Sequence, residues 1–263
     1  MIILSDNIQE RLEKKIEDGL VQKDREKKTE KDIFNKNKVI SEGLDKSTIM
    51  TLSGMINDGT LSYVNGAAGS GKESKIYWGV DPSCNDLAIK IYLVTTSNFK
   101  KRMHYLIGDH RFTRMKKGTR NMVALWARKE FDILNQCLKS GIPCVKPITV
   151  NKNVVVLEYV GKDGVPSPTL VEAEVDYDDY ENAVKIISDL YRRAKIVHAD
   201  LSEYNIFKTD KGLVLFDFGS AVDIRHPNAK EFLERDIRNI TKFFVKRGLT
   251  VENPIDVFER LIK

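Results

Sequence analysis

The chain divides where the spacing of its hydrophobic and polar positions changes. Near the start, in a segment dense in charge, apolar residues recur at every fourth position: Ile8, Leu12, Ile16 and Leu20. This spacing is typical of a helix with a narrow apolar stripe, which needs another surface to stabilise it. The pattern therefore predicts a charged, helical N-terminal extension over residues 1–45.

Residues 46–160 show mostly the period of β-strands. A short helix after Ser47, ended by Asp58-Gly59, is followed by apolar runs that are bounded by turn residues. These runs predict three strands and a hairpin: Leu61–Val64, Lys75–Val80, Leu87–Tyr92, and Val145–Val150 with Val154–Val160. One longer helix, ending at Gly141, interrupts the strands.

From residue 161 onward the pattern is mainly helical. Apolar positions with helical spacing predict helices from Tyr180 to Ala194 and from Phe232 to Phe244, and Pro254 begins a last short one. Strands first and helices afterwards predict an α+β fold of two lobes. We expect a small β-rich N-lobe over 46–160 and a mainly helical C-lobe over 161–263.

Composition narrows the class of protein. Apolar residues make up 41% and charged residues 31% of the 263 residues, which argues against a disordered chain. No apolar run approaches the length of a bilayer span. Three cysteines without a CxxC pair and four scattered histidines argue against a disulfide scaffold and a zinc site. We therefore expect a soluble intracellular protein that does not bind membranes.

Positive charge is concentrated in a segment that we take as an insert, residues 95–121. The whole chain has a net charge of +5, whereas this segment holds eight basic residues and a single acid, Asp109. The basic residues are Lys100, Lys101, Arg102, Arg111, Arg114, Lys116, Lys117 and Arg120. Such a block is a candidate surface for phosphate groups, and a solvated flexible loop is the alternative interpretation.

The strongest chemical signal is the string His198-Ala199-Asp200-Leu201-Ser202-Glu203-Tyr204-Asn205, followed by Asp217-Phe218-Gly219. Phosphoryl transfer to a hydroxyl needs one carboxylate that orients and deprotonates the nucleophile. It also needs an amide oxygen and a second carboxylate that hold magnesium. Each string alone is an ordinary loop or turn. Both in this order, with an apolar piece between them, favour a nucleotide-dependent phosphotransferase.

The same chemistry needs a lysine on a strand and a carboxylate on a helix in the N-lobe. Leu87-Ala88-Ile89-Lys90-Ile91-Tyr92 provides a lysine in the expected Ala-Ile-Lys form. Its ammonium would be partnered by phosphates and by a helix glutamate, for which we choose Glu130. Taken alone, Lys90 would be interpreted as a solvent-facing strand lysine.

These strings resemble those of the RIO family of atypical serine/threonine protein kinases, in particular the short archaeal form of its type-1 branch. Besides the Asp200 string, Ser70-Gly71-Lys72-Glu73-Ser74 is similar to the modified phosphate loop of that family, and the resemblance covers roughly residues 44–247. It implies a protein-kinase-like fold. It also implies Asp200 as the catalytic base, Asn205 and Asp217 as metal ligands, and Asp217 as a transient phosphate acceptor.

The resemblance further implies a nucleotide site. Lys90 would bind the phosphates with Glu130 as its partner, Ser70 and Lys72 would lie in the phosphate loop, and Asn205 would reach the nucleotide through the metal. The hinge whose backbone holds adenine would be formed by Glu158 and Val160. The implied cofactors are ATP and Mg²⁺, with Mn²⁺ as an alternative.

The resemblance implies a cytoplasmic protein whose partners are a protein substrate with a serine and a precursor of the small ribosomal subunit. Ribosomal RNA or protein of that precursor would bind the basic insert 95–121. His226 comes only nine positions after Asp217, and no Ala-Pro-Glu follows Gly219. The peptide-docking platform of ordinary kinases is therefore expected to be missing, and ATP hydrolysis is expected beside kinase activity.

Two other functions remain open at this point. Residues 66–73 nearly match the loop of P-loop NTPases, but Glu73 occupies the position where that loop needs a hydroxyl for magnesium. The sequence that follows is also β-like, where a P-loop would begin a helix. The other function is a kinase-shaped module that binds RNA or ribosomal protein with little turnover, against which the intact catalytic positions argue.

Overall fold

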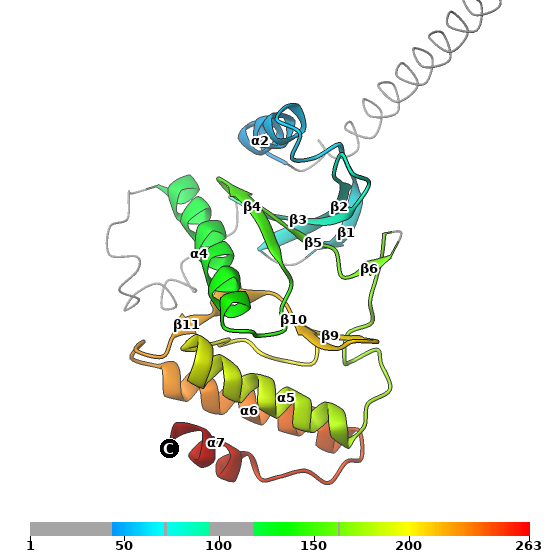
Figure 1. The fold of residues 1–263 in the computed structure, drawn as a ribbon. Coiled ribbons are helices and arrows are strands. Elements are labelled where there is room, and N and C mark those ends of the chain that lie inside the picture. Colours follow the sequence, from blue (N-terminus) through cyan, green and yellow to red (C-terminus); the bar gives the residue numbers. More distant parts are fainter. Residues whose placement is uncertain (1–43, 71–72, 95–117, 163) are drawn as a thin grey trace, which may run out of the picture.

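The computed structural model describes residues 44–70, 73–94, 118–162 and 164–263. The expected N-terminal extension 1–45, except its last two residues, lies outside the described residues, and so do Lys72 and most of the basic insert. The described chain forms two lobes, with the five-stranded sheet in one and helices α5, α6 and α7 in the other (Figure 1). The structure thus confirms the α+β fold with a β-rich N-lobe and a mainly helical C-lobe.

The N-lobe is built on one antiparallel sheet with the strand order β1-β2-β3-β5-β4. Its strands are β1 (Tyr63–Ser70), β2 (Ser74–Val80), β3 (Asp86–Tyr92), β4 (Pro147–Asn151) and β5 (Val154–Glu158). Strands β2 and β3 and the β4–β5 hairpin agree with the prediction, because alternating apolar positions face the core on either side of the sheet.

Strand β1 is longer than the sequence predicted. The expected strand ended at Val64, but β1 continues through most of the glycine-rich segment to Ser70, with register irregularities against β2. The glycines are compatible with such irregularities because they have no side chain to place. Because antiparallel strand β2 follows where a P-loop would start a helix, the segment does not have the strand–loop–helix order of P-loop NTPases.

Two helices pack on the sheet. Helix α2 (Lys46–Asn57) begins at Asp45, whose side chain accepts hydrogen bonds from the N–H groups of Ser47 and Thr48. Helix α4 (Thr119–Lys139) contains Glu130, and its first turn includes residues 119–121 of the expected insert. The buried face of α4 packs in the core cluster that continues into the C-lobe.

The C-lobe consists of helices joined by very short strands. Helix α5 (Tyr177–Asp189) begins at a capping box of Asp176 and Asp179 and continues as a π-helical turn, η3 (Leu190–Ala194). Helices α6 (Ala229–Lys246) and α7 (Pro254–Ile262) complete the lobe. The short elements are β6 (Gly161–Lys162), β7 (Val165–Pro166), β8 (Ile196–Val197), β9 (Ile206–Thr209), β10 (Gly212–Leu215), η4 (Phe218–Ser220) and β11 (Val222–Asp223).

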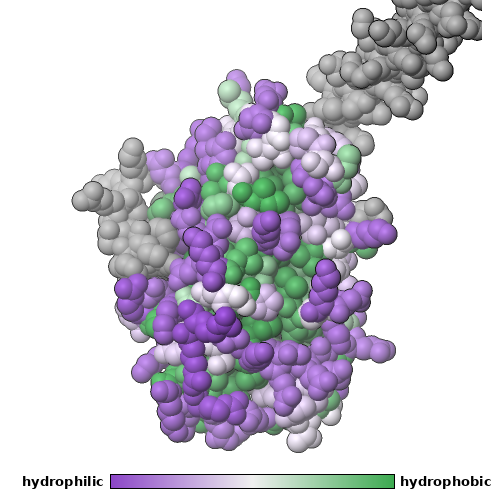
Figure 2. All heavy atoms as spheres, in the orientation of Figure 1, coloured by the Kyte–Doolittle hydropathy of each residue, from purple (hydrophilic) through white to green (hydrophobic). Residues whose placement is uncertain are grey.

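Apolar packing joins the lobes. One cluster of buried residues extends from α4 through the C-lobe helices, and a smaller one lies between α2 and the sheet. On the face shown in Figure 2, hydrophobic residues gather where the lobes meet, with hydrophilic residues around them. None of the helices in the described ranges has the length and apolarity that a membrane crossing requires.

Candidate active site

A cavity of ≈ 340 Å³ lies between the lobes. Its walls come from the sheet, from the connection after β5, and from the β9 region of the C-lobe. The register of β3 on β5 pairs Ala88 with Leu157 near this connection, and Lys90 lies farther along β3. One part of the cavity is therefore apolar, and another carries the charges of Lys90 and Asp217.

The charged part is built around Lys90, whose ammonium contacts two carboxylates. Its Nζ atom lies 2.6 Å from Oε1 of Glu130 and 2.7 Å from Oδ1 of Asp217. Burial alone would lower the pKa of Lys90, but the carboxylates of Asp217 and Glu130 outweigh burial and hold this pKa above its ordinary value. The structure thus brings together the chosen lysine and glutamate, and it adds a contact with Asp217 that the sequence did not predict.

The loop with Asp200 is closed by Asn205. The Asn205 side-chain amide donates to the Asp200 carbonyl over 2.8 Å, and the Asn205 carbonyl accepts from the N–H of Phe216 over 3.1 Å. The second bond places the Asn205 backbone next to the chain segment that leads into Asp217. The backbone of Asp217 has φ 61°, a left-handed conformation that turns the chain sharply into η4. Asp200 itself is exposed.

The backbone around Asp200 is held by Asp236 of α6. Its carboxylate, 1% exposed, accepts hydrogen bonds from the N–H groups of Ala199 (2.8 Å) and Leu201 (3.0 Å). Burial raises the pKa of Asp236 to about 7, although both hydrogen bonds oppose this shift. No role was predicted for this residue from the sequence, although it lies in the stretch Leu233–Asn239 that resembles the family. Its signal was an acid at a helical spacing of four from the apolar positions Phe232 and Ile240.

His198 supports the same loop from inside the C-lobe. Its ring packs 4.7 Å from that of Phe218, and its Nε2 atom lies 3.1 Å from the Phe216 carbonyl oxygen. Because a carbonyl only accepts, the assigned tautomer carries its proton on Nε2. Burial lowers the pKa of His198 below its ordinary value, which favours the neutral form of the ring.

Of the remaining predicted residues, two lie at the cavity. Glu158 and Val160 line it. The Glu158 carboxylate accepts from the Lys146 N–H over 2.7 Å, and the Val160 carbonyl accepts from the Ser167 N–H over 2.9 Å. Ser70 ends β1, but nothing is described of its side chain, and Lys72 falls between the described ranges.

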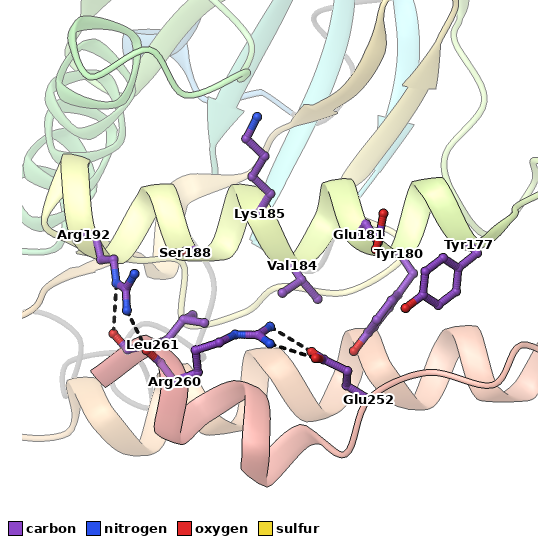
Figure 3. A pocket seen from close by; sticks show the side chains of 10 residues that line it. All are labelled: Tyr177, Tyr180, Glu181, Val184, Lys185, Ser188, Arg192, Glu252, Arg260 and Leu261. Atoms are coloured by element: carbon purple, nitrogen blue, oxygen red, sulfur yellow. Dashed lines mark hydrogen bonds and ion pairs between the residues drawn. The ribbon is translucent and has the colours of Figure 1, made fainter. Parts of the chain in front are cut away.

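A second cavity, also of ≈ 340 Å³, lies between α5 and α7 (Figure 3). Arg260 and Glu252 form a two-bond ion pair there, with both distances 2.8 Å. Arg192 donates to the carbonyls of Arg260 and Leu261 at the end of α7. These cations thus already bind groups of the protein, and none of the predicted site residues lines this cavity.

The arrangement between the lobes can be compared with known proteins. The family model for the RIO domain matches residues 75–256, which is more than half of the chain. The chain belongs to the RIO family. The expectation drawn from the Asp200 string is therefore confirmed at the level of the family.

Curated relatives of this RIO protein are named serine/threonine-protein kinases. It is 36% identical to serine/threonine-protein kinase RIO1 of Caenorhabditis elegans over 91% of this chain and 48% of that protein. It is also 36% identical to RIO-type serine/threonine-protein kinase Rio1 of Haloferax volcanii, over 80% of this chain and 73% of that protein. Against RIO1 of Homo sapiens the identity is 33% over 84% of this chain. The chain spans less than half the length of several of these relatives, 39% for rio1 of Dictyostelium discoideum.

Solved structures show the same fold. The Rio2 kinase from Chaetomium thermophilum, in a complex with ADP, Mg²⁺ and phosphoaspartate, matches with a TM-score of 0.60 at 20% identity, over 81% of this chain and 65% of that one. A second crystal structure of the Rio2 kinase from Chaetomium thermophilum also matches with a TM-score of 0.60, at 21% identity. The two-lobed kinase-like architecture of the RIO protein is thus shared with both.

Proposed function

We propose that this RIO protein is an atypical serine/threonine protein kinase that transfers the γ-phosphate of ATP with Mg²⁺, and that it also hydrolyses ATP. The observation that carries the proposal is the contact of Lys90 with both Glu130 and Asp217 at one cavity, together with the hydrogen bond by which the Asn205 side chain closes the Asp200 loop. The names of the curated relatives support the reaction class.

The chemistry of the side chains fits magnesium and nucleotide phosphates. A carboxylate (Asp217) and an amide oxygen (Asn205) are hard oxygen donors of the kind that Mg²⁺ prefers, and the metal would neutralise phosphate charge. The charged ammonium of Lys90 would bind phosphate oxygens. The apolar part of the cavity, which includes Ala88 and Leu157, would enclose the adenine ring. Mn²⁺ is the alternative metal.

In this proposal Asp200 is the catalytic base. Its carboxylate accepts the proton of a substrate serine while the oxygen of that serine attacks the γ-phosphorus, and the bond between this phosphorus and the ADP oxygen breaks to release ADP. For ATP hydrolysis, the carboxylate of Asp217 would instead attack. The new oxygen–phosphorus bond forms as the bond to the ADP oxygen breaks, and water then releases phosphate.

The test is ATP turnover by the full chain with and without magnesium. We expect ADP formation and transfer to serine of a protein substrate in Mg²⁺, and loss of both when EDTA removes the metal. Nucleotide binding without turnover would favour the binding-module alternative. Turnover that survives metal removal would contradict the proposed metal ligands Asn205 and Asp217.

We further propose a cytoplasmic role with a precursor of the small ribosomal subunit, bound through the insert 95–121, most of which lies outside the described residues. The support is its density of basic residues, because neutralised phosphates release counterions and make binding depend on salt. Reversing Lys100, Lys101, Arg102, Lys116 and Lys117 to glutamate should weaken association with the precursor and flatten its salt dependence. ATP turnover should change little.

Exposed lysines of α6 provide the matched control, because Lys242 and Lys246 lie on the described C-lobe surface. Their reversal to glutamate should leave precursor binding close to that of the wild type. Equal binding by the insert variant and the wild type would show that the insert is a solvated connection.

A further inference from the structure

Glu130 is a completely buried carboxylate whose two oxygens have different partners. Oε1 accepts from the Lys90 ammonium over 2.6 Å, and Oε2 accepts from the Tyr92 hydroxyl over 2.5 Å. A buried carboxylate oxygen without a hydrogen-bond donor lowers the stability of the folded protein, and it does so more strongly when the carboxylate is charged. The hydroxyl therefore satisfies the oxygen that Lys90 does not contact.

The position of Tyr92 follows from the strand. Residues two apart on β3 point to the same face, so Tyr92 lies beside Lys90, whose ammonium is 5.1 Å from the centre of the Tyr92 ring. Asn153 holds the backbone of Tyr92 by two hydrogen bonds, each of 2.9 Å. The Tyr92 N–H donates to the Asn153 carbonyl, and the Asn153 side-chain amide donates to the Tyr92 carbonyl. The ring thus projects from a fixed point.

The same hydroxyl also lies against the turn that follows Asp217. A side chain added at Gly219 would begin 3.1 Å from the Tyr92 hydroxyl oxygen and 3.4 Å from Nε1 of Trp126. The first distance is tighter than most real contacts of a β-carbon, so a methyl group at Gly219 would displace the hydroxyl or the turn. Tyr92 therefore lies between the Lys90–Glu130 pair and the segment that carries Asp217.

We propose that Tyr92 is a positioning residue, whose hydroxyl orients Glu130 toward Lys90 and couples this ion pair to the turn at Gly219. The inference rests on the proposed function, in which Lys90 binds phosphate and Asp217 binds the metal. A shift of the turn at Gly219 changes where the hydroxyl points, and Glu130 then holds Lys90 less firmly. The hydroxyl of Tyr92 in this way maintains the relative positions of the Lys90 ammonium and the Asp217 carboxylate.

The first test is the variant Tyr92→Phe, which removes the hydroxyl and keeps the ring. We expect kcat to fall about tenfold, the effect of one hydrogen bond to a charged group, with the dissociation constant for ADP changed less than about threefold. The control is Tyr77→Phe. Tyr77 is also a buried tyrosine of the sheet, but it belongs to the cluster that packs under α2. The Tyr77→Phe variant should retain the kcat of the wild type. If Tyr92→Phe also retained that kcat, the proposal would be overturned.

The second test separates positioning from mere packing. Gly219→Ala should lower kcat about tenfold in the wild type but less than about threefold in Tyr92→Phe, because the oxygen atom nearest the new methyl group is then absent. Likewise, Tyr92→Phe should cost little in a Glu130→Gln background. A purely structural role predicts that the separate losses multiply, and that result would overturn the coupling.

The same variants distinguish failure of this inference from failure of the proposed function. If the wild type shows no ATP turnover, the proposed function fails, and the coupling is read from urea unfolding of the same variants. Non-additive unfolding free energies of Tyr92→Phe with Glu130→Gln would then support the link between these two residues. Additive values would overturn it.

Discussion

The Asp200→Ala variant is expected to transfer phosphate to a protein serine about 10²–10⁴-fold more slowly than the wild type, with little change in nucleotide binding. This is the usual contribution of a positioned general base. The neighbouring imidazole of His198 does not replace it, because that ring is buried and its Nε2 faces the Phe216 carbonyl. Binding is spared because Asp200 does not line the cavity between the lobes.

The measurement is kcat together with the dissociation constant for ADP. Asp210→Ala is the matched control, because Asp210 is an exposed carboxylate in the turn between β9 and β10. This control should behave as the wild type. Phosphate transfer at a near wild-type rate in Asp200→Ala would remove the kinase assignment, whatever the nucleotide affinity.

The second large effect is expected for Asp236→Asn, which should lower turnover about 10- to 100-fold. A carboxylate accepts from both N–H groups of the loop, whereas an asparagine carbonyl replaces only one oxygen and its NH₂ group faces the other N–H. One anchor of the Asp200 loop is then lost, and small displacements of a catalytic group are costly. Glu234→Gln, on the same helix but in a surface ion pair with Arg238, should change turnover little.

The wild type and the Asp236→Asn variant also give a prediction about how stability depends on pH. Burial raises the pKa of Asp236 to about 7 in the folded protein, against about 4 in an unfolded chain. The folded state then binds more protons than the unfolded state between these values. The contribution of Asp236 to stability is complete below pH 4 and decreases until about pH 7, by at most about 1.4 kcal/mol per pH unit.

Urea unfolding of both proteins between pH 4 and 8 checks this sign. The asparagine does not ionise, so the unfolding free energy of the wild type minus that of Asp236→Asn should decrease as the pH rises to about 7 and then stay level. Parallel curves over the whole range would show that Asp236 is ionised throughout and that its burial carries no titration.

Local patterns predicted the parts of the fold that depend on neighbouring residues in the chain. The alternation in Leu87–Tyr92 and the hairpin around Asn151–Asn153 were sufficient to place β3, β4 and β5. The β6–β7 hairpin was missed because its residues are exposed and carry no apolar alternation. Strand β1 was predicted too short because glycine normally weakens strands, and here it is paired nonetheless.

Part of the candidate site could be proposed from the sequence, because short residue strings resembling those of kinases indicate which side chains would act there, even without the structure. The choice of Glu130 as partner of Lys90 needed only a helix with a carboxylate, although the two residues are 40 positions apart. The contacts of Tyr92 with Glu130 and of Asp236 with the Asp200 loop depend on tertiary packing. No local period indicates them, beyond an acid on an apolar helix face and a tyrosine two residues from the lysine.

The central claim is that one cavity holds Mg-ATP with Asp200 directed at the transferred phosphate. A crystal structure of the full chain with a non-hydrolysable ATP analogue and Mg²⁺ tests it most directly. The account predicts adenine between Ala88 and Leu157, Lys90 on the phosphates, Asn205 and Asp217 on the metal, and Asp200 facing the γ-phosphate. Nucleotide bound elsewhere, or a metal held without Asn205 and Asp217, would contradict it.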